Sequence, residues 1–164
     1  MNIVKYPDPI LTERIEEFDF VNPSVDPVQL EVDMLEFMYA NDGIGLSANQ
    51  IGERVRVFVM GNKNYPEQGQ AFFNPEVIAN TDDVKDLEEG CLSFPGLYVK
   101  VKRPTAIKAR WQNSKGETQE GTFEGYACKC FLHELDHLEG ITYKDRVSVL
   151  KWALANKKLK KGKH

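Results

Sequence analysis

The feature that most constrains this chain is the motif His133-Glu134-Leu135-Asp136-His137. Two histidines four residues apart lie one above the other on a single face of an α-helix, so both imidazoles can reach one metal ion. Glu134 can stand beside the open coordination position, where the general base for a water molecule is needed. The alternative is a helix with two unrelated histidines, because short motifs recur by chance. The only other histidine is His164, and this concentration of histidine favours the metal site.

A catalytic site of the zinc type needs a third protein ligand and keeps one position for water. No glutamate follows Glu139, and Tyr143 stands where the metzincin pattern would have a third histidine. Asp145 is a downstream alternative with little support. We therefore expect the third ligand upstream, and cysteine is the obvious residue type.

The chain has three cysteines, Cys91, Cys128 and Cys130. Cys130 precedes His137 by about 10.5 Å of helix rise, too far for both side chains to meet at one ion through metal bonds of roughly 2.0–2.3 Å. Cys130 is more plausible as a wall of the site, and Cys128 points off that face. Cys91 remains, and the glycine before it and the Pro-Gly pair after it give a bent backbone that can present a thiolate from another direction.

Three segments of the sequence together resemble the peptide deformylase family. They are Gly43-Ile44-Gly45-Leu46-Ser47-Ala48-Asn49-Gln50, Glu89-Gly90-Cys91-Leu92-Ser93 and His133-Glu134-Leu135-Asp136-His137-Leu138-Glu139-Gly140. Their order and spacing also match, and the resemblance runs from Tyr6 to about residue 150. The family usually has alanine at Ser47 and glutamine at Leu132. The resemblance implies an α+β fold, in which small antiparallel β-sheets pack around a central helix that carries the HExxH motif.

The resemblance also implies a reaction, the hydrolysis of the N-formyl group from the N-terminal formylmethionine of newly made peptides, with release of formate. In that reaction Cys91, His133 and His137 hold one divalent metal ion, and Glu134 moves the proton. The Gln50 side-chain amide and the Leu92 backbone N–H meet the oxyanion; an amide is a suitable donor for this purpose.

The substrate would lie extended beside the first two motifs, in the manner of an added β-strand. Its binding residues, by resemblance, are Ile44, Gly45, Gly90, Tyr126 and Cys130. For Tyr126 and Cys130 ordinary core packing is an equally good interpretation. The resemblance also suggests that Asp136 pairs with Arg103 and braces the helix, and the alternative is a solvated helix carboxylate.

One thiolate and two imidazoles suit zinc or ferrous iron. The family implies Fe²⁺, with Zn²⁺, Ni²⁺ or Co²⁺ able to occupy the site, and the sequence does not choose among them. Two rival functions stay open at this point. One is an HExxH zinc endopeptidase, which needs a third ligand that the downstream sequence does not supply. The other is a non-enzymatic domain with a structural metal, which would close all four coordination positions.

Local patterns predict the elements around these motifs. Asp26 is predicted to be an N-cap and Pro27 the first residue of a helix. This helix is expected to run to about Asn41 with a broad apolar face. Strands are expected over 55–60, 71–78, 99–101, 105–112 and 118–123, with Pro75 disturbing the second and a hairpin turn at 113–117. Residues around Cys91 are expected to form a loop. The metal helix should span about 126–139 and stop at Gly140. A last helix over 146–161 carries an apolar stripe of Val147, Leu150 and Leu154.

The chain of 164 residues is long enough for one catalytic domain over 1–164, with 146–164 as a C-terminal helix and basic tail. The net charge of −4 with mixed signs gives no reason to expect a specific nucleic-acid partner. No apolar run approaches the ~20 residues of a membrane span, and the first residues lack a secretory signal. An odd number of cysteines fits a reducing cytoplasm. The basic run at 157–161 reads as a solvated helix end, with a transient ribosome contact as the alternative.

Overall fold

The computed structural model describes residues 1–161. Its α-helices are α1 (Pro27–Ala40), α2 (Gly125–Leu138) and α3 (Val149–Lys161). The strands are β1 (Gly45–Ser47), β2 (Val57–Met60), β3 (Gln70–Asn80), β4 (Val84–Cys91), β5 (Phe94–Pro104), β6 (Ala106–Gln112) and β7 (Thr118–Glu124). Short 3-10 helices lie at Pro9–Thr12, Ala48–Ile51, Pro66–Gln68 and Tyr143–Arg146.

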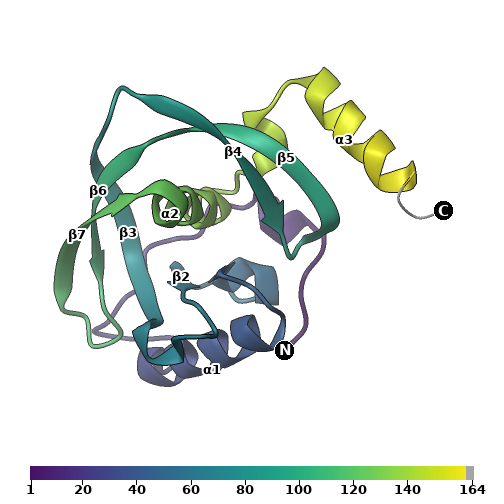
Figure 1. Cartoon of the computed structure of the whole chain (residues 1–164). Coiled ribbons are helices and arrows are strands. Elements are labelled where there is room, and N and C mark those ends of the chain that lie inside the picture. The colour runs from purple at the N-terminus through teal and green to yellow at the C-terminus, as the bar shows by residue number, and fades with distance from the viewer. Residues whose placement is uncertain (162–164) are drawn as a thin grey trace.

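The strands form two antiparallel sheets. One has five strands in the order β1-β2-β3-β6-β7, and the other consists of β4 and β5. Helix α2 lies between them, with α1 on the far side of β2 (Figure 1). The expected α+β fold, with small antiparallel sheets around a central helix, is confirmed.

Helix α1 begins as the sequence predicts. The Asp26 side chain accepts hydrogen bonds from the N–H groups of Val28 and Gln29, and Pro27 is the first helical residue. Leu30, Met34 and Met38 are buried against β1, β2 and β3. The buried face is narrower than predicted, because Val28 and Val32 are exposed.

Strand β3 is disturbed where proline was expected to disturb it. The register with β6 shifts between Phe73 and Glu76, and Asn74 adopts a positive φ of 48°. Proline has no N–H group to donate to the hydrogen bonds between strands, so within a sheet it is usually found beside such an irregularity. The Asn74 side chain compensates by bonding both the N–H and the C=O of Phe18.

The two-stranded sheet differs from the prediction. Residues 84–91 were expected to be irregular and only 99–101 were expected to be extended, yet β4 and β5 form one long ribbon. Strand β4 gives little apolar alternation because most of its side chains are exposed. Opposite charges face each other across the ribbon instead, at Asp86 and Lys102 and at Glu88 and Lys100. Cys91 therefore lies at the end of a strand.

Helix α2 has an apolar face and, on its opposite side, a polar face. Cys128, Phe131 and Leu138 pack into the core with Phe58 and Phe72 of the larger sheet. The helix ends at Leu138, as expected, because Gly140 adopts a positive φ of 74° and its N–H caps the His137 carbonyl. The opposite face, which carries both motif histidines, turns toward β1 and Cys91.

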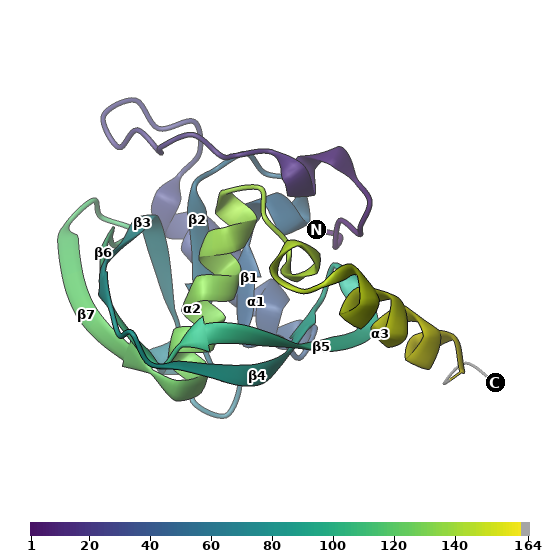
Figure 2. The ribbon, with the colours of Figure 1, turned by 90° about the horizontal axis from the view of Figure 1, so that it is seen from above.

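Helix α3 projects from the side of the molecule and contacts β5 along part of its length (Figure 2). The packed face consists of Trp152, Ala155 and Leu159. The stripe seen in the sequence is a different one, since Leu150 is 69% exposed and Leu154 is 57% exposed. The helix also begins at Val149, later than the expected residue 146. Of the expected tail, residues 162–164 lie outside the described part of the chain. None of the helices within residues 1–161 is long and apolar enough to cross a membrane.

Candidate metal centre

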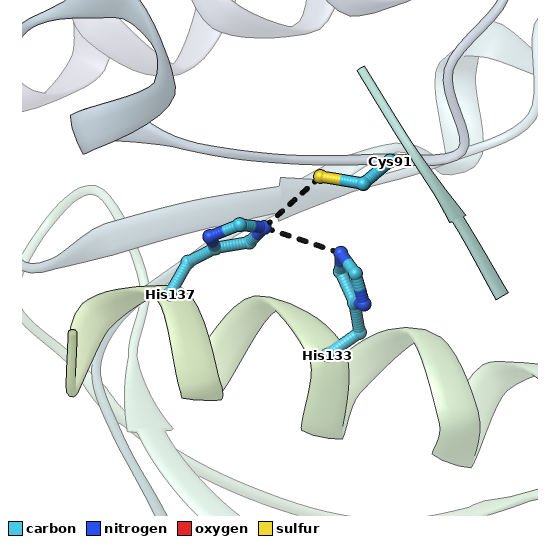
Figure 3. Close-up of side chains that lie close together, drawn as sticks. All are labelled: Cys91, His133 and His137. Carbon is cyan, nitrogen blue, oxygen red and sulfur yellow. Dashed lines mark hydrogen bonds between the residues drawn. The ribbon is translucent and has the colours of Figure 1, made fainter. Parts of the chain in front are cut away.

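Three side chains from two distant segments converge at one point. Cys91 comes from the end of β4, and His133 and His137 come from successive turns of α2 (Figure 3). The His137 Nε2 atom lies 3.3 Å from Cys91 Sγ and 3.2 Å from His133 Nε2. The three donor atoms all lie within 4.8 Å of one another. The residues that the sequence singles out as ligands are thus brought together.

The donor set fits a tetrahedral divalent metal. Ligand atoms that sit 2.0–2.3 Å from such an ion lie roughly 3.3–3.7 Å apart, close to the two distances above. Burial and the charge of His133 hold the pKa of His137 well below its usual range, so its ring stays neutral and keeps a lone pair for a metal. Burial lowers the pKa of His133, but Cys91 and Glu89 outweigh it and raise that pKa. The negative groups around His133 therefore favour a positive charge at this point, which a bound cation would supply in place of the ring proton on Nε2.

A chain of buried ionic contacts fixes the orientation of His133. Its Nδ1–H donates to Glu89 Oε1 at 2.8 Å, which leaves the Nε2 lone pair directed at the centre. Arg103 holds both Glu89 oxygens, at 2.8 and 2.9 Å, and reaches Asp136 Oδ2 at 2.7 Å. The expected Arg103–Asp136 contact is present. Arg146 also binds both oxygens of Asp136, at 3.0 and 2.7 Å.

The Gln50 amide is held in one orientation. Its Oε1 accepts from the Ser47 N–H at 3.0 Å and from the Ser47 hydroxyl at 3.1 Å, so the donor end must face the other way. That Nε2 donates to Ser93 Oγ at 3.1 Å and lies 3.4 Å from Cys91 Sγ. The hydroxyl of Ser47, the residue that departs from the family pattern, shares its one hydrogen between Gln50 Oε1 and the nearer Asn49 Oδ1, which lies at 2.7 Å.

Glu134 is buried beside the donor atoms. Its Oε1 lies 4.0 Å from His133 Nε2, and its Oε2 has no hydrogen-bond partner among the described residues. Burial raises the pKa of Glu134 to about 7, although His133 acts in the opposite direction. A carboxylate with that pKa can both take up and release a proton near neutrality.

A cavity of about 410 Å³ opens in front of the donor atoms. It is lined by six of the predicted oxyanion and substrate residues, Ile44, Gly45, Gln50, Gly90, Leu92 and Cys130. Gly45 lets the backbone approach α2 closely, since a Cβ there would lie 2.7 Å from Cys130 Sγ. Tyr126 is not part of the lining; its side chain is 69% exposed.

The sequence prediction missed several residues of this site. Glu89 was quoted in a motif without a role, and Arg146 was not considered. Tyr98 and Lys129 line the cavity and were also missed. The only available signal for Glu89 was its place in the motif, because the sequence does not distinguish it from the exposed Glu88.

Comparisons with known proteins agree on one family. The polypeptide deformylase family matches residues 1–152. Peptide deformylase from Thermotoga petrophila is 42% identical over 156 residues, which cover 93% of this chain and 90% of that protein. Peptide deformylase 1 from Burkholderia multivorans is 40% identical over 161 residues, which cover 98% and 88%. The crystal structure of a peptide deformylase from Legionella pneumophila is 33% identical, with a TM-score of 0.88 and coverage of 99% of this chain and 94% of that one.

The family match spans the three sequence motifs, the donor set at Cys91, His133 and His137, and both sheets. The matching relatives are covered over most of their own length, so the likeness is not confined to one segment. The chain therefore belongs to the polypeptide deformylase family.

Proposed function

We propose that this chain is a metal-dependent hydrolase that removes the N-formyl group from the N-terminal formylmethionine of newly made peptides and releases formate. The observation that carries the proposal is the convergence of Cys91, His133 and His137 at a cavity that also holds a Glu134 oxygen with no hydrogen-bond partner among residues 1–161. Residues 1–164 would act as a single catalytic domain.

Cys91, His133 and His137 would hold the ion, and Glu89 and Arg103 keep His133 in position for it. When bound, a divalent metal supplies a Lewis acid that makes water a stronger nucleophile near neutral pH. The donor set is compatible with iron and zinc. We propose Fe²⁺ as the native metal, with Zn²⁺, Ni²⁺ or Co²⁺ as substitutes.

The residues of the chain supply the proton transfer and part of the charge stabilisation. Glu134 takes a proton from the attacking water through its free Oε2 and returns it to the nitrogen of the leaving amine. The C–N bond of the formamide breaks, formate leaves with the new oxygen atom, and the peptide keeps a free amine. The Gln50 Nε2–H and the Leu92 N–H donate to the negative charge that develops on the formyl oxygen.

The substrate would bind as an extended strand in the cavity. Strand β1 is an edge of the five-stranded sheet, which leaves backbone groups for an added strand. Ile44, Gly45, Gly90 and Cys130 would contact the formylmethionine end of the peptide. Tyr126, which stands outside the lining, would have to reach the substrate from the rim.

The test is formate release from formyl-Met-Ala-Ser by enzyme purified without oxygen, together with metal analysis. We expect one metal ion per chain and turnover of this peptide but not of casein. Cleavage of casein would favour an endopeptidase instead.

Replacement of Glu134 by alanine tests the catalytic role of the site. We expect Glu134→Ala to lower kcat by about 10²–10⁴-fold, the usual contribution of a general base, while the metal content stays at one ion per chain. Loss of the metal together with activity would favour a structural metal site. Glu88→Ala, on the exposed face of β4, serves as the matched control.

We also propose that the enzyme works in the cytoplasm and contacts the ribosome transiently. Its described cysteines are free thiols, as a reducing compartment allows. Helix α3 projects from the molecule and ends in Lys157, Lys158, Lys160 and Lys161, which would be attracted to ribosomal RNA. Co-sedimentation with ribosomes should fall several-fold in a Lys157→Glu, Lys161→Glu double variant and should weaken with salt. Unchanged sedimentation would argue against this contact, and the activity on free peptides should not change.

A further inference from the structure

Lys129 is a cation at the cavity, and none of residues 1–161 places an anion against it. It is the only lysine or arginine among the described residues that line the cavity. Its Nζ donates to the Glu88 backbone carbonyl at 2.7 Å and lies 4.7 Å from the centre of the Tyr126 ring. The side chain is half-buried. These two contacts hold the ammonium group in place, and neither of them neutralises its charge.

Two of the acidic groups on the cavity wall are compensated from within the protein. Glu89 is held by Arg103, and Asp42 is paired with Lys63. In the part of the chain that the structure describes, no carboxylate lies within 4.0 Å of Lys129 Nζ. An ammonium group has three N–H donors, and one is used by Glu88. Lys129 can therefore receive an anionic group of a bound molecule.

The strand that Lys129 binds indicates which part of a peptide the ammonium group can meet. The Glu88 carbonyl that it binds is three residues before Cys91 on β4, about 10 Å along an extended strand. An extended peptide advances about 3.3 Å per residue. A substrate that ran alongside β4 with its formyl group at the metal donors would bring its second or third residue level with Glu88, and so beside the ammonium group.

We propose that Lys129 is a specificity residue, and that it favours formylated peptides with an aspartate or glutamate at the second or third position. This inference rests on the proposed deformylase activity and adds a preference to it. An ion pair at a partly solvated rim contributes modestly, so the expected preference for glutamate over glutamine is about 3- to 10-fold in kcat/KM at low salt.

The test compares four peptides with amidated C-termini, so that no terminal carboxylate interferes. They are formyl-Met-Glu-Ser, formyl-Met-Gln-Ser, formyl-Met-Ser-Glu and formyl-Met-Ser-Gln. The metal-loaded wild type, Lys129→Met, Lys129→Arg and Lys108→Met are assayed on each. Lys108 is an exposed lysine of β6 outside the cavity lining and provides the matched control.

We expect the wild type and Lys108→Met to prefer the glutamate peptide of at least one pair, Lys129→Arg to retain the preference and Lys129→Met to lose it. The wild-type preference should also shrink between low and 0.5 M salt, roughly in line with screening, which tests the idea without any variant. Equal rates on both members of each pair in the wild type, or a preference that survives in Lys129→Met, would overturn the inference. No turnover of any peptide by metal-loaded wild type would instead count against the proposed function.

Discussion

At the scale of single residues, the contacts of Gln50 with Ser47 determine which end of its side-chain amide faces the site. An amide can present either its oxygen or its nitrogen, and both Ser47 groups bind the oxygen. The nitrogen therefore faces Cys91 and the cavity. Gln50 can then act as a hydrogen-bond donor to a developing oxyanion with the N–H that points toward Cys91.

Replacement of Gln50 by methionine keeps the volume and removes both polar ends. We expect kcat for formyl-Met-Ala-Ser to fall by about 10²–10³-fold, the usual effect of losing one oxyanion donor. The metal content should stay at one ion per chain, because Gln50 is not a ligand. Steady-state kinetics and metal analysis on the same preparation check both statements. A kcat within threefold of the wild type would remove Gln50 from the mechanism.

The limits of sequence reasoning are also visible at this scale. The spacing of His133 and His137 predicted their common face, because an α-helix has a fixed period. The partner of His133 could not be predicted from spacing. Glu89 and Glu88 are identical in type, and only the pleat of β4 sends the first inward and the second outward.

At the scale of elements, the metal helix depends on a ribbon that the sequence did not reveal. Strand β4 carries both Cys91 and Glu89, and β5 carries Arg103, so the ribbon positions one donor atom directly and a second through Glu89. The side chains of β4 do not alternate clearly between apolar and polar, because most of them are exposed. Backbone pairing with β5 fixes this strand, and such pairing leaves little trace in composition.

The buried contact of Glu89 with Arg103 and His133 predicts acid sensitivity. Burial raises the pKa of Glu89, but the hydrogen bonds from Arg103 and His133 outweigh it and lower the pKa to about 2. A carboxyl whose pKa is lower in the folded state stabilises the fold above its unfolded pKa, and this contribution is lost as the pH falls. From pH 5 to pH 2 the free energy of unfolding should drop by up to roughly 3 kcal/mol from this group.

Urea unfolding of the metal-free protein at several pH values measures this drop. The Glu89→Gln variant should be less stable at pH 6 and should lose this part of the pH dependence. The Glu88→Gln variant, changed at the exposed neighbour, should keep the wild-type dependence. If wild type and Glu89→Gln showed parallel curves from pH 6 to pH 2, the ionic contact would not be the source of the acid sensitivity.

At the scale of the whole molecule, the C-terminal helix α3 completes an aromatic cluster behind the cavity wall, together with Phe94 and Tyr143. Trp152 of α3 packs edge-on against Phe94, and its ring centre lies 5.6 Å from those of Phe94 and Tyr143. Phe94 pairs with Cys91 across the turn of the ribbon, and Pro95 and Gly96 line the cavity. Residues far apart in the sequence thus support the metal centre from behind. The sequence showed that a last helix exists but not its packed face, because that face is defined by residues of β5.

Replacement of Trp152 by alanine tests this support. We expect the free energy of unfolding to fall by about 2–3 kcal/mol. This is at or below the low end of what the loss of a large aromatic side chain usually costs, because Trp152 is only half-buried. Since Phe94 then loses a neighbour beside Cys91, the variant should also release its metal faster to a chelator. Denaturant unfolding and the rate of metal transfer to a coloured chelator measure the two effects.

Leu154→Ala is the matched control for this experiment. Leu154 lies on the same helix and is also apolar, but its side chain is mostly exposed. A change at such a site should alter the free energy of unfolding by no more than about 0.5 kcal/mol, and metal release should match the wild type. If the two variants were equally stable and released metal equally fast, α3 would have no supporting role, because Trp152 contacts the cluster around Phe94 and Tyr143 and Leu154 is mostly exposed.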